Sequence, residues 1–376
     1  MISLEKYQEI IIWGACLSPE EIGGDATSPG YASEKLYGLL QSNGYADRII
    51  FYVDSNKNIQ GRSKYGREIV DPARILEYPH ALVIICSISQ MAIMKAIENM
   101  HAGNDCLFVP YYFLHGTAGH PYNKIYAKEY LEAHRHEINK FYDTTDQHTK
   151  KCLNIIFKSH ESEEDDLYTK EFFGGTGAYL DYFGDADIAP KGDVTYIDVG
   201  AFCGETIEPV RKMYQSRLKK CIAFEPNESS REKLQAYVTE NSLGGLVDIF
   251  PYALGNKNCT ISFFANGGIS KIVEDGHNGE IEQLEQRVFD QLPDIDLVGE
   301  LMVKMDIEGA ELGALEGMRQ LIQQHQPYLA ICVYHREGDI YDIPHYLHSL
   351  YPGYRFYLRS GWHLECWAVP ERHFRG

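Results

Sequence analysis

The residues with the clearest chemical potential form a glycine-containing segment in the second half of the chain. Tyr196–Thr206 reads Tyr-Ile-Asp-Val-Gly-Ala-Phe-Cys-Gly-Glu-Thr, an apolar run followed by two glycines and a helical pattern. Gly200 and Gly204 allow the backbone to turn sharply and to approach a ligand closely. Twenty-five residues after Gly200, the next apolar run ends at Glu225, whose carboxylate can accept hydrogen bonds from both ribose hydroxyls of an adenosine. The spacing predicts an adenosine-containing cofactor.

Two acidic residues of this segment favour S-adenosylmethionine over NAD. A dinucleotide places its pyrophosphate at a helix N-terminus, where free N–H groups and the helix dipole attract anions. Here Asp198 ends the strand and Glu205 stands at the start of the helix, so a diphosphate would meet two carboxylates. The sulfonium and ammonium groups of S-adenosylmethionine would be attracted to them. Taken alone, Glu205 could equally compensate the helix dipole, an effect of about 0.3–1 kcal/mol.

Alternating apolar runs and helical patterns surround these residues and predict an α/β domain over residues 191–376. The last two apolar runs are separated only by residues 359–363, which predicts a hairpin and an antiparallel edge on an otherwise parallel sheet. Class I methyltransferases have this arrangement, and NAD-binding Rossmann domains usually lack it. The seven predicted strands are Val194–Val199, Lys220–Phe224, Val247–Tyr252, Leu301–Met305, Tyr328–Val333, Arg355–Leu358 and Leu364–Val369.

The order and spacing of the polar segments resemble the FkbM family of S-adenosylmethionine-dependent methyltransferases. The resemblance covers about residues 175–370, and its most specific piece is Lys304-Met-Asp-Ile-Glu-Gly-Ala-Glu311. Phe202-Cys203, inside the glycine loop, departs from the family pattern. The other matching segments are Asp198–Glu205, Phe224–Pro226, Ala253–Gly255, Gly317 and Tyr334-His335.

The resemblance implies methyl transfer from S-adenosylmethionine, commonly to a hydroxyl oxygen of a sugar or polyketide. It also implies that Glu225 holds the ribose, that Asn227 lies beside the adenosine, and that Tyr252 borders the adenine. The complete set of expected cofactor-binding residues is Asp198, Gly200, Ala201, Phe202, Gly204, Glu205, Thr206, Glu225, Pro226, Asn227, Tyr252 and Ala253.

Three charged residues, Lys304, Asp306 and Glu308, lie where the fourth strand ends, and His335 follows the fifth. Strand periodicity places the three on one face as the strand ends. Because ligands of open α/β sheets bind outside the carboxyl ends of the strands, this group should face the methyl group. Methyl transfer mainly requires alignment of donor and acceptor and removal of a proton from the alcohol. We expect Asp306 or His335 to act as base or acceptor clamp, with Lys304 tuning the carboxylates.

Two other interpretations of this group remain open. Asp306 and Glu308 could cap the free N–H groups of the helix that begins near Gly309, with Lys304 as an internal ion-pair partner. Alternatively, Asp306, Glu308 and His335 could hold a divalent metal ion, since carboxylate oxygens and imidazole suit Mg²⁺, Mn²⁺ or Zn²⁺. Their spacing fits no standard metal motif, so the sequence predicts no metal site.

Two further function classes also remain open. An NAD-dependent sugar dehydrogenase or epimerase would need a Tyr-x-x-x-Lys catalytic pair or a Gly-x-Gly-x-x-Gly loop free of acids. Tyr111–Phe113 and the residues after them supply no such pair, and neither glycine loop of the chain fits. A non-catalytic module that binds S-adenosylmethionine or a glycan would share the residues of an active site. The methyl acceptor could also be a nitrogen atom instead of an oxygen.

The first 115 residues predict a smaller Rossmann-like α/β domain, and residues 116–190 a helical or irregular connector. Near-continuous apolar runs at Glu9–Gly14, Arg48–Asp54 and His80–Ser87 alternate with helical patterns, which is typical of a parallel sheet covered on both faces. A nucleotide or nucleotide sugar could bind near Gly14 and Asp54. We favour a structural role, because a complete Gly-x-Gly-x-x-Gly motif is missing.

Composition excludes several partners. The formal net charge is −19, whereas a nucleic-acid binder needs a cationic face, so we expect no nucleic-acid partner. The apolar runs are too short for a membrane span, and the N-terminus does not resemble a signal peptide. Nine scattered cysteines without a Cys-x-x-Cys pair are typical of reduced thiols in a cytoplasm. The expected partner is a small-molecule or glycan acceptor, and a homo-oligomer is compatible with the sequence.

Overall fold

The computed structural model describes residues 4–14, 30–87, 93, 96–97, 99–108, 126–158, 187–266, 269–272, 281–293, 295–360 and 364–375. The chain divides into two compact units. The first comprises Met1–Lys124 with Phe157–Tyr179, and the second comprises Ile125–Ile156 with Leu180–Gly376. Within the described ranges, no helix has the length and apolar character needed to cross a membrane.

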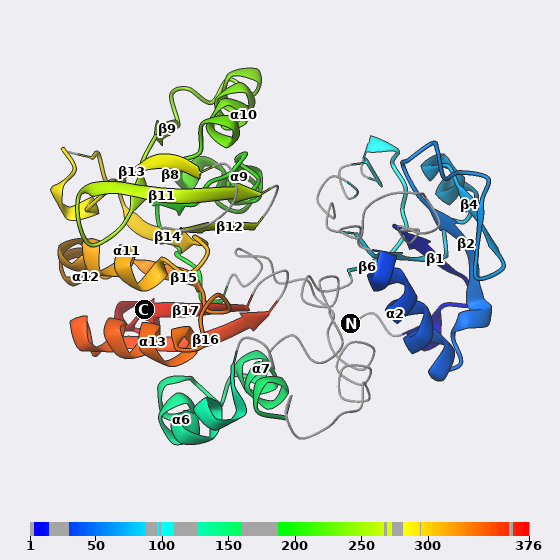
Figure 1. The fold of residues 1–376 in the computed structure, drawn as a ribbon, viewed down its shortest axis with the longest axis horizontal. Helices are drawn as coiled ribbons and strands as arrows, with labels where there is room; N and C mark the ends of the chain where they lie inside the picture. The colour runs from blue at the N-terminus through cyan, green and yellow to red at the C-terminus, as the bar shows by residue number, and fades with distance from the viewer. Residues whose placement is uncertain are drawn as a thin grey trace. The chain divides into compact units, whose positions relative to one another are not determined.

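The described part of the first unit forms a six-stranded sheet in the order β3-β4-β2-β1-β5-β6 (Figure 1). Every neighbouring pair is parallel except β3 with β4. All four residues of β1 are buried, which explains why its sequence is continuously apolar. The three predicted strands are present, and the others are too short or too polar to stand out. The elements are β1 (Ile10–Trp13), α2 (Gly30–Ser42), β2 (Ile49–Val53), β3 (Ser63–Lys64), β4 (Arg67–Val70), β5 (Leu82–Ile85) and β6 (Cys106–Phe108).

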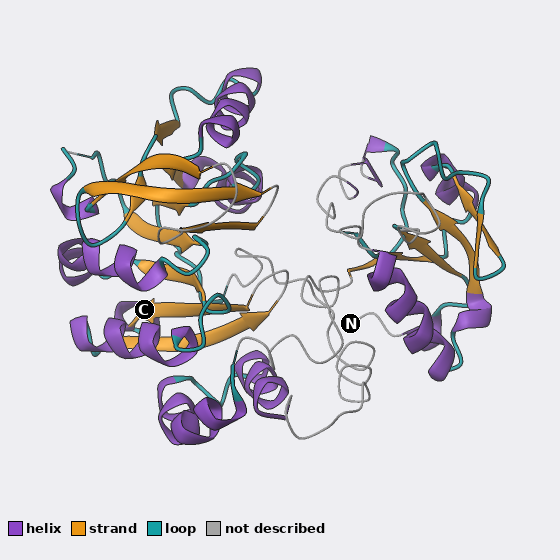
Figure 2. Cartoon of the chain, viewed as in Figure 1, coloured by secondary structure: helices purple, strands orange, loops and turns teal. Residues whose placement is uncertain are grey.

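The described part of the second unit contains a seven-stranded sheet in the order β16-β17-β15-β14-β7-β8-β9. The predicted hairpin is present: β17 pairs antiparallel with both β15 and β16, and the other described pairs are parallel (Figure 2). The predicted seven-stranded, mostly parallel sheet with a hairpin at its edge is thus confirmed. The antiparallel strand β17 lies next to the edge, and β16 forms the edge itself. The strands are β7 (Val194–Val199), β8 (Leu218–Phe224), β9 (Val247–Phe250), β14 (Glu300–Met305), β15 (Tyr328–Cys332), β16 (Tyr354–Ser360) and β17 (Leu364–Pro370).

Helices follow the strands of this sheet as the periodicity predicts, with one interruption. The continuous helical pattern over 311–324 is divided in the structure at Met318. At the adjoining Gly317, an added Cβ would lie 2.1 Å from the carbonyl oxygen of Gly255, so the first of the two helices contacts the neighbouring backbone closely. The helices are α9 (Ile207–Tyr214), α10 (Glu228–Glu240), α11 (Glu311–Gly317), α12 (Arg319–His325) and α13 (Asp339–Leu350).

A second sheet, with the described order β10-β13-β11-β12, was not predicted. In β13, apolar Ile281 and Leu284 are three residues apart among polar residues, a spacing that favours a helix over a strand. Antiparallel pairing with β11 overrides that local pattern. The strands are β10 (Ala253–Leu254), β11 (Cys259–Asn266), β12 (Ile269–Ile272) and β13 (Ile281–Arg287).

Two helices from the predicted connector, α6 (Lys128–Phe141) and α7 (Gln147–Lys158), pack on the hairpin side of the large sheet (Figure 1). The Thr149 hydroxyl of α7 accepts a hydrogen bond from the backbone N–H of Leu358 in β16 at 3.0 Å. Asp146, just before α7, forms an ion pair with the buried Arg359 at 2.7 Å. These contacts attach α7 to the edge strand of the sheet.

Candidate active site

The loop after β7 has the backbone conformation that its glycines predict. Gly200 and Gly204 have φ values of +81° and +85°, and Phe202 between them has +45°. A Cβ added to Gly200 would lie 2.2 Å from the carbonyl oxygen of Asp306. The loop therefore lies directly against the segment that follows β14, and only glycine fits at this position.

A buried ion pair connects the two segments. Asp198 in β7 is fully buried, and its Oδ1 lies 3.1 Å from Nζ of Lys304, which is 4% exposed. Lys304 also donates a hydrogen bond to the carbonyl oxygen of Gly200 at 2.7 Å, and Thr206 donates one to Asp198. Burial alone would lower the pKa of Lys304, but the charges of Asp198 and Asp306 raise it above its usual value. The ammonium of Lys304 thus holds the glycine loop against β14.

Glu225, directly after β8, is buried at the other side of the loop. Its Oε2 accepts a hydrogen bond from the backbone N–H of Phe202 at 2.8 Å, and Oε1 accepts one from Asn227 at 2.9 Å. Burial raises the pKa of Glu225, and these two hydrogen bonds oppose the increase. Each carboxylate oxygen has a second lone pair, so the group retains acceptor capacity for ribose hydroxyls.

The residues expected around the adenine lie after β8 and β9. Asn227 caps α10 by accepting a hydrogen bond from the N–H of Ser230 at 2.9 Å, and it donates a second bond to Glu282. The ring of Tyr252 lies 5.4 Å below the guanidinium of Arg287, and Ala253 begins β10. Asn227 is therefore engaged at both ends of its amide within the chain.

Glu205 contributes a negative charge near the glycine loop. It precedes the first residue of α9, Ile207, by two positions and is exposed. Desolvation of its carboxyl, together with the negative charges of Asp198 and Asp306, raises the pKa of Glu205, and Lys304 opposes the increase. The carboxylates are close enough to repel one another, so a cationic ligand beside them would be favoured over a diphosphate.

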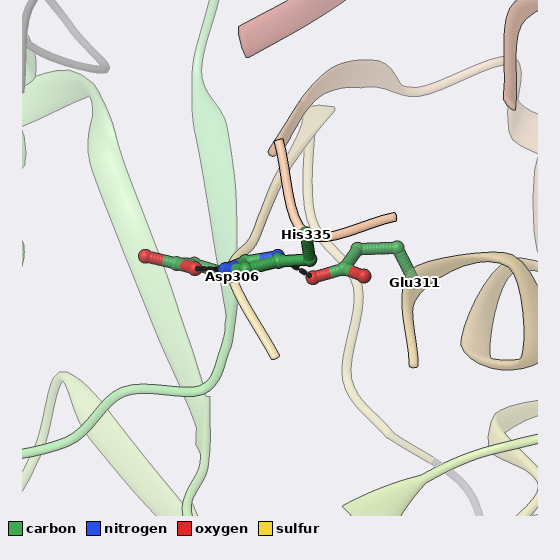
Figure 3. A group of neighbouring side chains, drawn as sticks. All are labelled: Asp306, Glu311 and His335. Carbon is green, nitrogen blue, oxygen red and sulfur yellow. Dashed lines mark hydrogen bonds and ion pairs between the residues drawn. The ribbon is translucent and has the colours of Figure 1, made fainter. Parts of the chain in front are cut away.

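A cluster of carboxylates surrounds His335, which follows β15. Figure 3 shows its imidazole between Asp306 and Glu311. Nδ1 lies 2.9 Å from Oε1 of Glu311, and Nε2 lies 3.4 Å from Oδ1 of Asp306 and 3.6 Å from Oε2 of Glu308. Glu311 is fully buried and also accepts the backbone N–H of Ile307 at 2.9 Å.

The charges of the cluster decide the protonation of the imidazole. Burial alone would lower the pKa of His335, but the hydrogen bond to Glu311 and the negative charges of Asp306, Glu311 and Glu308 raise it to about 9. With no other cation present, the imidazole is therefore protonated near neutral pH. In that form it donates hydrogen bonds and cannot act as a base.

A model for the "Methyltransferase FkbM domain" family matches residues 198–356, which contain the glycine loop, Glu225 and the His335 cluster. These residues form an FkbM methyltransferase domain. A comparison with curated proteins returns no match.

Two solved structures resemble the chain. Methyltransferase FkbM from Methylobacillus flagellatus KT shares the fold, with a TM-score of 0.53 and 17% sequence identity over 97% of this chain and 90% of that one. A SAM-dependent methyltransferase from Aquifex aeolicus has a TM-score of 0.29 and 14% identity, over 49% of this chain and 85% of its own. The first likeness supports the α/β fold, and the family match identifies the methyltransferase domain.

The turn after β14 in the FkbM domain differs from the sequence-based expectation. Strand alternation was expected to place Lys304, Asp306 and Glu308 on one face, but β14 ends at Met305. Positive φ values of +58° at Glu308 and +95° at Gly309 then turn the chain, so that both carboxylates approach His335 while Lys304 contacts Asp198.

Neither Asp306 nor Glu308 occupies the N-cap position of α11, where the capping interpretation placed such an acid. α11 begins at Glu311, and its N-cap is Ala310, which has no side chain able to accept a hydrogen bond. Glu311, which accepts the N–H of Ile307, belongs to the site although it was not predicted there from the sequence. Its position as the last acid of the Lys-x-Asp-x-Glu-Gly-x-Glu segment was the available signal.

Proposed function

We propose that the FkbM domain transfers a methyl group from S-adenosylmethionine to a hydroxyl oxygen of a sugar or of a related small-molecule or glycan acceptor. The observation that supports the cofactor most strongly is the position of Glu225, a buried carboxylate beside a glycine loop that carries acids. A carboxylate at the end of the second strand suits two ribose hydroxyls, and the acids suit a sulfonium and an ammonium.

Different residues around the loop would bind different parts of the cofactor. Glu225 would accept hydrogen bonds from the ribose, with Pro226 and Asn227 beside the adenosine and Tyr252 and Ala253 beside the adenine. The loop from Asp198 to Thr206 would enclose the methionine part. Lys304 would act indirectly, because its ammonium contacts Asp198 and the Gly200 carbonyl and holds the loop in place.

The acceptor would lie at the carboxyl ends of β14 and β15, where Asp306, Glu308 and His335 converge. In the transfer, the acceptor oxygen forms a bond to the methyl carbon while the carbon–sulfur bond breaks and S-adenosylhomocysteine leaves. The hydroxyl proton must pass to a nearby group. We assign this role to Asp306, because the raised pKa of His335 leaves the imidazole protonated and able only to clamp the acceptor.

The first test is calorimetric titration of the full chain with S-adenosylhomocysteine and, separately, with NAD. We expect S-adenosylhomocysteine to bind and NAD not to bind. Glu225→Ala should abolish that binding, whereas Glu228→Ala, which changes an exposed acid three residues away, should leave it unchanged. Binding of NAD alone would contradict the proposal and favour a sugar oxidoreductase; binding of neither would favour a non-catalytic module.

The acceptor is tested with S-adenosylmethionine carrying a labelled methyl group and a panel of free sugars, nucleotide sugars and amino sugars. Label in an ether linkage of a sugar supports the proposal, and label on an amine contradicts the choice of oxygen. Asp306→Asn should lose transfer while still binding S-adenosylhomocysteine. Full transfer by this variant would remove Asp306 as the base.

We also propose a cytoplasmic location, on the basis of nine scattered cysteines that form no paired motif. None of the described cysteines is in a disulfide. Cell fractionation with a tagged full-length chain tests this proposal, and recovery in a secreted or periplasmic fraction would contradict it.

A further inference from the structure

The cluster around His335 has the composition of a metal site. One potential ligand atom from each of Asp306, Glu311 and His335 lies within 4.8 Å of the other two (Figure 3). The three residues come from the turn after β14, the first turn of α11 and the segment after β15. Because separate elements supply them, their spacing in the sequence matches no metal motif.

Two atoms of the cluster lack the hydrogen bonds that their burial requires. Among the described residues, Nε2 of His335 and Oε2 of Glu311 are buried and have no hydrogen-bond partner. The side chain of His335 is 8% exposed and that of Glu311 is fully buried. A buried polar atom without a hydrogen bond costs about 1–3 kcal/mol, so such atoms usually have a ligand or partner. Around Nε2 the nearest oxygens are those of Asp306 at 3.4 Å and Glu308 at 3.6 Å, which form ion pairs with the ring but no hydrogen bond.

The distances in the cluster also suit coordination. Neighbouring ligands about 2.1 Å from a metal ion are about 3.0 Å apart in an octahedron and about 3.4 Å apart in a tetrahedron. An imidazole binds one ion through a single nitrogen. Nδ1 of His335 lies 2.9 Å from Oε1 of Glu311, as two ligands of one ion would, whereas Asp306 faces the other ring nitrogen, Nε2, at 3.4 Å and must turn to join them. Asp306 is partly exposed, at 19% of its side chain, so its carboxylate has room to turn toward an ion.

We propose that Asp306, Glu311 and His335 bind one divalent cation of the Mn²⁺ or Zn²⁺ type. Two carboxylates and an imidazole are donors that these ions accept, and the imidazole favours them over Mg²⁺. The charge also fits, because Glu308 adds a third carboxylate 3.6 Å from the imidazole. Lys304, the nearest buried ammonium, is already paired with Asp198.

The cation would lie beside the methyl donor if the proposed function holds. The Gly200 loop contacts the backbone of Asp306 so closely that no side chain fits between them. A bound cation could polarise the acceptor hydroxyl and lower its pKa. The ion would take the place of the proton on His335, so the imidazole would coordinate the ion instead of clamping the acceptor. A carboxylate has two oxygens, so coordination through one oxygen of Asp306 is compatible with proton acceptance by the other. This consequence rests on the proposed function, whereas cation binding does not.

The test is titration of the chelator-treated full chain with each ion separately. Binding of Mn²⁺ is measured as the loss of the paramagnetic resonance signal of free Mn²⁺, and binding of Zn²⁺ is measured by calorimetry. No cofactor is added, so failure of S-adenosylhomocysteine binding would not affect the result. We expect one cation per chain for at least one of the two ions. Absence of binding of both ions at millimolar concentration would overturn the proposal and leave a protonated His335 as the occupant.

Variants locate the site. Asp306→Asn, Glu311→Gln and His335→Gln should each weaken binding at least tenfold. Glu316→Gln is the matched control, because Glu316 is an exposed acid on the same helix as Glu311 and should leave binding unchanged. Circular dichroism checks that each variant folds. If the variants of buried Glu311 and His335 do not fold, the test depends on Asp306→Asn, because Asp306 is partly exposed. Equal binding by the wild type and by a folded Asp306→Asn would overturn the assignment.

Discussion

Removing one partner of the ion pair between Lys304 and Asp198 should be one of the more destabilising single substitutions in the second unit. Both side chains are buried, at 4% and 0% exposure, so water cannot replace the missing partner. Lys304→Met leaves the Asp198 carboxylate with the hydroxyl of Thr206 but without a counter-charge. Breaking one partner of a buried pair costs about 3–5 kcal/mol. Because the pKa of Lys304 is raised, this cost should not depend on pH near neutrality.

The magnitude is best measured as a double-mutant cycle. Asp198→Asn retains the shape of the side chain and leaves Lys304 its hydrogen bond to the Gly200 carbonyl, so we expect a smaller loss of about 2–3 kcal/mol. The double variant removes both charges together and should be less destabilised than the sum of the single variants. We expect a coupling energy of about 2–3 kcal/mol, the upper range for residues in direct contact.

The assay is unfolding in urea, monitored by hydrogen exchange of peptides that cover β7 and β14. These peptides report on the second unit alone. Lys220→Met is the control: Lys220 pairs with Asp248 at 2.6 Å, but the two side chains are 20% and 45% exposed. Exposed pairs contribute about 0–1 kcal/mol, so this loss should be small. Additive effects of Lys304→Met and Asp198→Asn, within about 0.5 kcal/mol, would refute the reasoning.

Two further predictions concern the glycine loop and the helices at the hairpin. Gly200→Ala should lower the free energy of unfolding by at least about 2 kcal/mol and weaken S-adenosylhomocysteine binding, because Gly200 has a positive φ and contacts the backbone of Asp306. The control is Gly313→Ala, which adds a methyl group in open space on α11 and should be neutral or stabilising in the same unfolding assay. Asp146→Asn should cost about 2–3 kcal/mol at neutral pH by leaving Arg359 buried without its partner. Because hydrogen bonds from Thr149 and Arg359 lower the pKa of Asp146 despite its burial, this contribution is present above the unfolded pKa and lost as pH falls through the folded one. Unfolding measured from pH 7 to 3 should therefore show the gap between wild type and variant closing below about pH 4; a constant gap would contradict this.

The large sheet could be predicted because its strands are nearly continuous apolar runs. Because a strand such as β15 (Tyr-Leu-Ala-Ile-Cys) is buried on both faces, its sequence is apolar throughout. Such a strand can be recognised without knowing which strands it pairs with. The four-stranded sheet could not be predicted in this way, because β13 (Ile-Glu-Gln-Leu-Glu-Gln-Arg) has polar residues at most positions. Pairing with its neighbours β11 and β10 defines it as a strand.

The same distinction applies to the candidate site. The glycine loop and Glu225 could be predicted because they follow strands whose ends are visible in the sequence. The contact between His335 and Glu311 depends on the turn after β14, where Glu308 adopts a positive φ that few non-glycine residues have. A rule based on strand alternation cannot anticipate that turn, so Glu311 was missed and the ion pair of Lys304 with Asp198 was not predicted.

The ion pair also changes the electrostatic argument for the cofactor. The sequence alone suggests that Asp198 and Glu205 together repel a diphosphate. In the structure the charge of Asp198 is compensated by Lys304 at 3.1 Å, so Asp198 contributes little net field outside the pair. The selection of a cationic ligand must then depend on Glu205, whose pKa is raised by desolvation and by neighbouring carboxylates, and on Asp306 across the loop. Glu205→Gln should therefore weaken binding of the sulfonium S-adenosylmethionine more than binding of the neutral thioether S-adenosylhomocysteine. Calorimetry with both ligands tests this prediction. An equal loss of affinity for both ligands would mean that Asp198, and not Glu205, selects the cationic ligand.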